Sequence, residues 1–171
     1  MEFSDVIKNR YSCKKFSSEQ IGKDKLDAIL EAGRVAPTAK NLQEQHIYVV
    51  QSESALETID KLTPCRYNAP TVLIVAYNKN NVFTYLGDKR NSGIEDATIV
   101  ATHLMLAAYN EGVDSCWINF FNPDELAKAF NLPEDEEILM LLDIGVADKT
   151  TTPLPNCLLY TSPSPRDISG S

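Results

Sequence analysis

Apolar residues along this chain fall into two kinds of run, one with extended and one with helical spacing. Residues 71–77 are almost continuously apolar, which predicts a strand covered on both faces. Residues 46–51 and 115–121 are rich in β-branched and aromatic side chains and predict two more strands. The apolar run at 138–144 predicts a fourth.

Helical spacing separates these strands. Apolar residues on one face predict a short N-terminal helix, and a second helix is expected over residues 23–36. Ser52 is expected to cap a third helix, and Asn122 with Pro123 is expected to open another. The predicted buried positions of the first, third and last of these helices are Phe3, Val6 and Ile7, then Leu56, Ile59 and Leu62, then Leu126, Ala129 and Phe130.

The longest helical pattern runs from Ser92, a candidate cap, to Glu111, before Gly112. Its apolar stripe is wide, and a small domain has little surface with which to cover it. The pattern therefore predicts a homodimer with this helix near the interface. The stripe consists of Ile94, Ala97, Ala101, Leu104, Met105 and Ala108.

Helices and strands interleave along residues 1–156, which predicts one α/β or α+β domain around a single sheet. Residues 157–171 differ in character, because the stretch from Cys157 to Asp167 matches the translation of a transposon-end adapter used in sequencing libraries. A natural Pro/Ser-rich tail is the alternative. We expect a non-native tail here and leave it out of the functional argument.

Composition narrows the function classes. The chain has 171 residues and a formal net charge of −8, from 24 acidic and 16 basic residues. Such a chain is a poor candidate for binding nucleic acid or an anionic membrane surface. It lacks a membrane-length apolar run and a signal-peptide pattern, so the cytoplasm is the expected location.

Metal-binding and common catalytic motifs are absent. Four widely spaced cysteines are expected to be reduced thiols, and the two histidines lack metal-ligand spacing. The seven glycines form neither a GxGxxG fingerprint nor a phosphate-binding P-loop, and no GxSxG is present. We therefore expect no metal and find no protein nucleophile in the sequence.

Three polar segments remain as candidate chemistry. In the first, Arg10, Ser12 and Lys14 alternate, so an extended backbone places them on one side as a small anion site. The second, residues 36–43, offers hydroxyl and amide groups that can read the edge of a heteroaromatic ring. The third, residues 115–119, places Trp117 and backbone amides in a strand. Taken singly, the segments are better explained by a solvated basic patch, by ordinary turn chemistry and, for Trp117, by core packing.

Taken in order, these segments resemble the short FMN-dependent nitroreductase family. The family pattern is R-x-S-x-[RK]-x-F, then A-P-[ST]-x-x-N-x-Q, then a long helix ending in L-A-A-x-x-x-G, then a strand with W-I. Here those motifs stand at residues 10–16, 36–43, 106–112 and 117–118. The resemblance covers residues 3 to about 150.

The resemblance implies a three-layer α+β fold, with a mostly antiparallel central sheet flanked by helices and two intertwined protomers sharing FMN. It also implies a ping-pong oxidoreductase, in which NADH or NADPH reduces the flavin at N5 and a nitroaromatic, quinone or similar flat acceptor then takes the electrons. No protein side chain is expected to be catalytic. The implied cofactor-binding residues are Arg10, Tyr11, Ser12, Lys14, Pro37, Thr38, Asn41, Gln43, Ile118 and Asn119, some of them from the partner.

The chain departs from the family pattern in two places. The family often has Pro-Trp after the glutamine, whereas Glu44 and Gln45 stand here, so contacts near the ring are expected to differ. A basic segment usually follows the last strand, and we expect the natural chain to continue past Asn156. A non-catalytic flavin-binding protein and a branch with other flavin chemistry, such as reductive dehalogenation or desaturation, stay as alternatives.

Overall fold

The predicted sheet is present as four antiparallel strands. The computed structural model describes residues 1–87 and 89–151, so the tail expected at 157–171 lies outside the described residues. The strands are β1 (Gln45–Val50), β2 (Thr71–Asn78), β3 (Asp114–Ile118) and β4 (Glu136–Gly145). Their order is β1-β2-β4-β3, and all three pairings are antiparallel.

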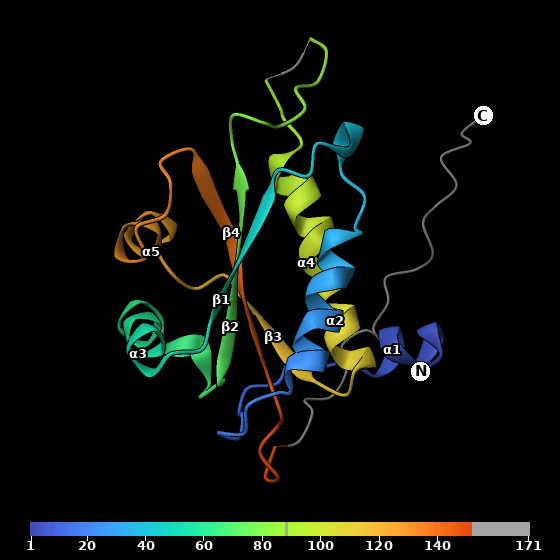
Figure 1. The fold of residues 1–171 in the computed structure, drawn as a ribbon, viewed down its shortest axis with the longest axis vertical. Helices are drawn as coiled ribbons and strands as arrows, with labels where there is room; N and C mark the ends of the chain where they lie inside the picture. Colours follow the sequence, from blue (N-terminus) through green and yellow to red (C-terminus); the bar gives the residue numbers. More distant parts are fainter. Residues whose placement is uncertain (88, 152–171) are drawn as a thin grey trace, which may run out of the picture.

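Helices cover both faces of this sheet and complete three layers (Figure 1). One face carries α1 (Phe3–Asn9), α2 (Lys23–Arg34) and α4 (Gly93–Asn110), and the other carries α3 (Glu53–Leu62) and α5 (Pro123–Ala129). Two short 3₁₀ turns, η1 (Ala39–Asn41) and η2 (Pro64–Arg66), lie in connections. The prediction of a three-layer α+β fold with a central antiparallel sheet is confirmed.

The strand β2 shows why the apolar run at 71–77 forms a central strand. Its residues from Thr71 to Tyr77 are all buried. Leu73 and Val75 pack with α2 and α4, whereas Val72 and Ile74 face the second core below α3 and α5. Two cores on opposite faces require apolar residues at every position, which is the pattern in the sequence.

Helix starts follow the sequence with one difference in their capping. The side chain of Asn122 accepts hydrogen bonds from the backbone N–H groups of Asp124 and Glu125, as expected for a cap. Ser52 and Ser92 stand at the expected positions, but neither side chain makes a capping hydrogen bond. The Ser92 hydroxyl instead accepts from the N–H of Phe83, because the preceding loop folds back over it.

Some predicted burial and boundaries are wrong. Ala129 is exposed, and Ala127 packs against the core in its place. The third strand ends at Ile118 rather than at residue 121. Phe3 and Ile7 in α1 are 67% and 41% exposed, and Ile94 in α4 is 57% exposed. These apolar side chains are largely uncovered by the described residues.

Candidate functional site

The segment at residues 12–17 runs along the end of the sheet. The N–H of Cys13 donates to the carbonyl of Ser115 in β3 at 2.9 Å, and the N–H of Ser17 donates to the carbonyl of Val146 at 2.8 Å. Cys13 and Phe16 are buried in the core below α3 and α5. Because Cys13 points inward, the side chains on either side of it, Ser12 and Lys14, are exposed.

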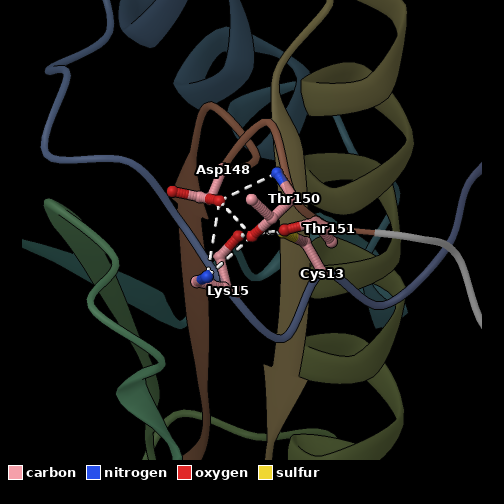
Figure 2. Close-up of polar contacts among 5 residues, drawn as sticks. All are labelled: Cys13, Lys15, Asp148, Thr150 and Thr151. Atoms are coloured by element: carbon pink, nitrogen blue, oxygen red, sulfur yellow. Dashed lines mark hydrogen bonds and ion pairs between the residues drawn. The ribbon is translucent and has the colours of Figure 1, made fainter.

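The turn after β4 holds this segment in place (Figure 2). The carbonyl of Lys15 accepts hydrogen bonds from the N–H of Asp148 at 3.0 Å and the hydroxyl of Thr151 at 2.9 Å. It also accepts a contact of 3.2 Å from the thiol of Cys13. The Lys15 ammonium donates to the hydroxyl of Thr150 at 2.7 Å and lies 3.5 Å from Asp148. The charge of Lys15 is thus already paired.

Arg10, Ser12 and Lys14 are arranged differently. Within residues 1–87 and 89–151, their side chains make no hydrogen bond or ion pair. Two cationic groups and one hydroxyl therefore lie close together in the chain with their donors unused, which is the donor set that a phosphate needs. Tyr11 faces inward instead, and its hydroxyl bonds to the carboxylate of Asp114. Burial and the charge of Asp114 raise the pKa of Tyr11. The hydrogen bond to Asp114 holds the segment against the start of β3.

The polar turn at residues 37–43 has an unusual backbone. Lys40, Asn41 and Gln43 have φ angles of 52°, 55° and 53°, in the left-handed region that non-glycine residues rarely adopt. The hydroxyl of Thr38 accepts from the N–H of Gln43 at 3.1 Å and closes the turn. The side-chain amides of Asn41 and Gln43 are exposed and have no hydrogen-bond partner among the described residues. Pro37 is exposed at the start of the turn.

Neighbouring elements hold this turn at both ends. The Oδ1 atom of Asp96, in the first turn of α4, accepts from the N–H of Ala39 at 2.9 Å. The carbonyl of Glu44 accepts from the N–H of Asn78 at the end of β2 at 2.8 Å. A strained backbone that is fixed from outside is typical of a site whose polar groups are held ready for a ligand.

The third predicted part of the site, around Ile118 and Asn119, has fewer polar groups available to a ligand than the other two parts. The side chain of Ile118 is buried toward α3 and α5, so only its backbone is available. The indole N–H of Trp117 donates to the side-chain oxygen of Asn119 at 2.9 Å, which occupies that oxygen. In the part of the chain that the structure describes, the outer edge of β3 pairs only through Ser12 and Cys13 near Ser115, and its far end has no strand partner.

The two halves of the candidate site lie at opposite ends of α4 (Figure 1). The turn at 37–43 contacts the first turn of this helix through Asp96. Arg10 directly follows α1, which lies beside the last turns of α4. Phe3 and Val6 of α1 line a groove between the two helices together with His103 and Leu106 of α4. The helix between these contacts is about 15–20 Å long at 1.5 Å per residue. One chain alone therefore does not bring the two halves together.

The sequence did not predict the contact between two buried acids, Glu44 and Asp96. Glu44 is 2% exposed and its carboxyl lies against that of Asp96, which is 4% exposed. Burial and the neighbouring Asp96 raise the pKa of Glu44 to about 7. In the sequence Glu44 stood out only as a departure from the family pattern, and Asp96 only as an acid suited to a helix N-terminus.

A third buried acid lies on the other face of the sheet. Asp143 in β4 is fully buried, and neither of its carboxyl oxygens has a hydrogen-bond partner among the described residues. Burial raises its pKa to about 9, and the nearby guanidinium of Arg66 opposes that shift. The described cysteines, Cys13, Cys65 and Cys116, are free thiols.

Residues 1–87 and 89–151 contain neither a cluster of metal ligands nor a helix fit to span a membrane. No group of three or more His, Cys, Asp or Glu side chains is arranged to hold a metal ion there. No helix in the same residues has the length and apolar character needed to cross a bilayer.

Comparison with known proteins gives consistent matches. The family model described as "Nitroreductase family" matches residues 7–66 and 63–146. A crystal structure of a nitroreductase family protein from Clostridium difficile 630 superposes with a TM-score of 0.85 and 32% identity, covering 91% of this chain and 88% of that one. The Bacillus subtilis protein YodC, named as an NAD(P)H nitroreductase, is 29% identical over 85% of this chain and 89% of its own length.

One further solved structure carries a flavin. The crystal structure of a nitroreductase with bound FMN from Bacteroides fragilis has a TM-score of 0.78 and 23% identity. The match covers 91% of this chain and 94% of the other. At this identity the likeness concerns the fold alone.

Proposed function

The chain belongs to the nitroreductase family, and we propose that it is an FMN-dependent oxidoreductase that passes electrons from NADH or NADPH to a nitroaromatic, quinone or similar flat acceptor. The observation that carries this proposal is the pair of exposed polar segments described above. Both expose donors or acceptors that are unused among the described residues, and both are held by hydrogen bonds to the sheet or to α4.

The basic segment fits the phosphate end of FMN. Arg10 and Lys14 supply cationic donors and Ser12 a hydroxyl, so a phosphate would receive charge-assisted hydrogen bonds. The chain as a whole is acidic, with a net charge of −8, so an anionic cofactor depends on local cations such as this pair. Tyr11 contributes by keeping the backbone against Asp114.

The strained turn fits the ring end of FMN. The amides of Asn41 and Gln43 each offer a donor and an acceptor, which suits the mixed edge of an isoalloxazine. Pro37 and Thr38 fix the start of the turn. Ile118 pairs with Leu141 of β4 on one side, and on the other side the backbone of Ile118 and Asn119 has no strand partner among the described residues. The role of these residues is to bind and orient the ring.

A homodimer is part of the proposal, because the two halves are separated by most of the length of α4. A second copy can supply the turn to the basic segment of the first. An apolar surface supports the same arrangement, since α4 buries Ala97, Ala101 and Leu104 within its own chain and still exposes Ile94 and Ile99. Exposed apolar side chains beside a buried apolar stripe are typical of a helix that also contacts a partner.

When bound, FMN supplies the redox chemistry by accepting a hydride equivalent and passing on electrons. The protein supplies binding, orientation and electrostatics. We also propose a cytoplasmic location, which the free thiols of Cys13, Cys65 and Cys116 support because thiols stay reduced there.

Anaerobic reduction tests this function. The FMN-loaded chain is mixed with NADH or NADPH without oxygen, and we expect the visible flavin band to bleach and to return when a quinone or nitroaromatic is added. A chain that binds FMN but is bleached by neither nicotinamide would be a non-catalytic flavin-binding protein. A chain that binds no FMN would contradict the proposal entirely.

A further inference from the structure

Glu44 and Asp96 form a contact between two buried acids beside the strained turn. Glu44 directly precedes β1, and Asp96 lies in the first turn of α4. Among the described residues, no donor reaches either carboxyl oxygen of Glu44 or the Oδ2 atom of Asp96. Two ionised carboxylates in this position would repel each other, and three of their four oxygens have no hydrogen-bond partner among the described residues. One shared proton turns the same contact into a hydrogen bond.

The pair is connected to the turn at both of its ends. Oδ1 of Asp96 accepts from the N–H of Ala39, where the turn begins. Glu44 directly follows Gln43, where the turn ends, and its own carbonyl is fixed by Asn78. The two carboxyl groups therefore join the start and the end of a backbone that holds three non-glycine residues at positive φ. Such a conformation persists only where its surroundings fix it.

We propose that Glu44 is a positioning residue: it donates a proton to Asp96, and the resulting pair holds residues 38–43 in the geometry that binds the flavin ring. The inference rests on the proposed function for its ligand. Loss of the proton to solvent leaves two adjacent negative charges, which push the ends of the turn apart. FMN affinity then depends on the protonation of a pair that is buried beneath the turn.

The surroundings determine when the proton is lost. Burial and Asp96 raise the pKa of Glu44 to about 7. Ionisable groups of the segments packed around the pair have contacts of their own: Lys40 of the turn lies over the ring of Phe83, Arg90 of the loop before α4 lies over the ring of Tyr85, and Tyr77 of β2 bonds to Glu137. Tyr85 bonds to Glu95 of α4 and is also close enough to be affected by the charge of Asp96.

The sign of the pH dependence follows from this shift. The folded chain holds the proton to a higher pH than the unfolded chain, in which glutamate ionises near 4.5. The pair therefore stabilises the fold fully below pH 4.5, and this contribution is lost as the pH rises through about 7. The variant Glu44→Gln removes the dependence, because an amide donates to Asp96 at every pH.

The test compares the full chain with Glu44→Gln and with an exposed control, Glu53→Gln in α3. Two quantities are measured between pH 4.5 and pH 8.5: the free energy of unfolding without FMN, and the dissociation constant of FMN. The control and the wild-type chain should lose stability relative to Glu44→Gln up to about pH 7. Their FMN affinity should fall about tenfold between pH 6 and pH 8, and that of Glu44→Gln less than about twofold.

A second variant, Asp96→Asn, tests the same shared proton if Glu44→Gln does not fold. In Asp96→Asn the side-chain oxygen still accepts from Ala39 and the amide donates to ionised Glu44, so the same flat profile is expected. Parallel unfolding profiles for the wild-type chain and both variants would show that no proton is shared. A shared proton without a matching change in FMN affinity would overturn the positioning role. Absence of FMN binding in every chain would overturn the proposed function, while the unfolding curves would still decide whether the proton exists.

Discussion

Gly93 lies directly against the aromatic ring of Tyr77. A Cβ atom at residue 93 would be 2.3 Å from Cε2 of that ring, well inside van der Waals contact. Gly93 is the first residue of α4, and Tyr77 belongs to the buried strand β2. The close approach brings the start of α4, and with it Asp96, next to the end of β2 and the strained turn.

This contact predicts that Gly93→Ala destabilises the chain. Alanine favours a helix over glycine by up to about 1 kcal/mol, but the clash with a rigid, buried ring should cost about 1–3 kcal/mol. We expect a net loss in the free energy of unfolding by urea. Glu57→Ala, at an exposed position of α3 on the opposite face of the sheet, is the control and should change it little. If Gly93→Ala were as stable as the wild-type chain, the helix would not be confined by Tyr77.

Arg10→Ala should weaken FMN binding. Removing one charge-assisted hydrogen bond to a phosphate costs about 1.5–3 kcal/mol, or about 10- to 150-fold in the dissociation constant. The matched control is Lys15→Ala, which removes the same charge from the same segment but from a side chain paired with Asp148 and Thr150. Fluorescence titration with FMN measures both. Equal losses in the two variants would indicate a general charge effect and no specific phosphate contact.

Ile99→Asp should dissociate the proposed dimer. Ile99 is 38% exposed on α4, and a buried unpaired carboxylate at a dimer interface is costly. We expect a monomer with weakened FMN binding by light scattering and cofactor titration. Ala129→Asp in α5, which lies on the opposite face of the sheet, introduces the same charge and should leave the dimer intact. A dimeric Ile99→Asp chain would exclude this face of α4 from the interface.

Asp143→Asn should reduce the loss of folding stability that occurs as the pH rises, independently of Glu44. Burial raises the pKa of Asp143 to about 9, whereas the unfolded residue ionises near 3.8. The folded state therefore holds an extra proton across this range, and stability falls by up to about 1.4 kcal/mol per pH unit as the pH rises. The asparagine variant should lose less stability than the wild-type chain between pH 5 and pH 8.5. An identical slope in both chains would show that Asp143 is ionised when folded.

Local sequence patterns were sufficient to predict the helices and strands of the fold. The strand β2 was predicted because all of its residues serve one of two cores, and α5 because the cap at Asn122 depends only on neighbouring residues. The exposure of Phe3 and Ile94 was not predicted, because an apolar stripe does not show which chain covers it. Ser92 failed as a cap because its hydroxyl binds Phe83, nine residues earlier, which is a tertiary contact.

The candidate site was predictable in its donors and acceptors but not in its anchoring. Arg10, Ser12 and Lys14 alternate in the sequence, and an extended backbone leaves all three available. The positive φ angles of Lys40 and Gln43 have no local signal, because these residues do not favour that conformation. The contact of Glu44 with Asp96 joins residues 52 positions apart, and only the packing of α4 against the turn creates it.

The central claim is that one FMN site takes its basic segment from one chain and its polar turn from another. Two damaged chains test it most directly: Arg10→Ala, defective in the segment, and Asn41→Ala, defective in the turn. Each is given a different affinity tag, the two are produced together, and the mixed dimer is purified. The number of FMN molecules bound per dimer is then measured at a concentration where neither variant alone retains the cofactor.

If the site is shared, one site of the mixed dimer carries both defects and the other carries none. We therefore expect one FMN per mixed dimer, reducible by NADH or NADPH. If each chain built its own site, both sites of the mixed dimer would carry one defect and would stay empty. A mixed dimer that binds no FMN, beside a wild-type dimer that binds two, would contradict the account.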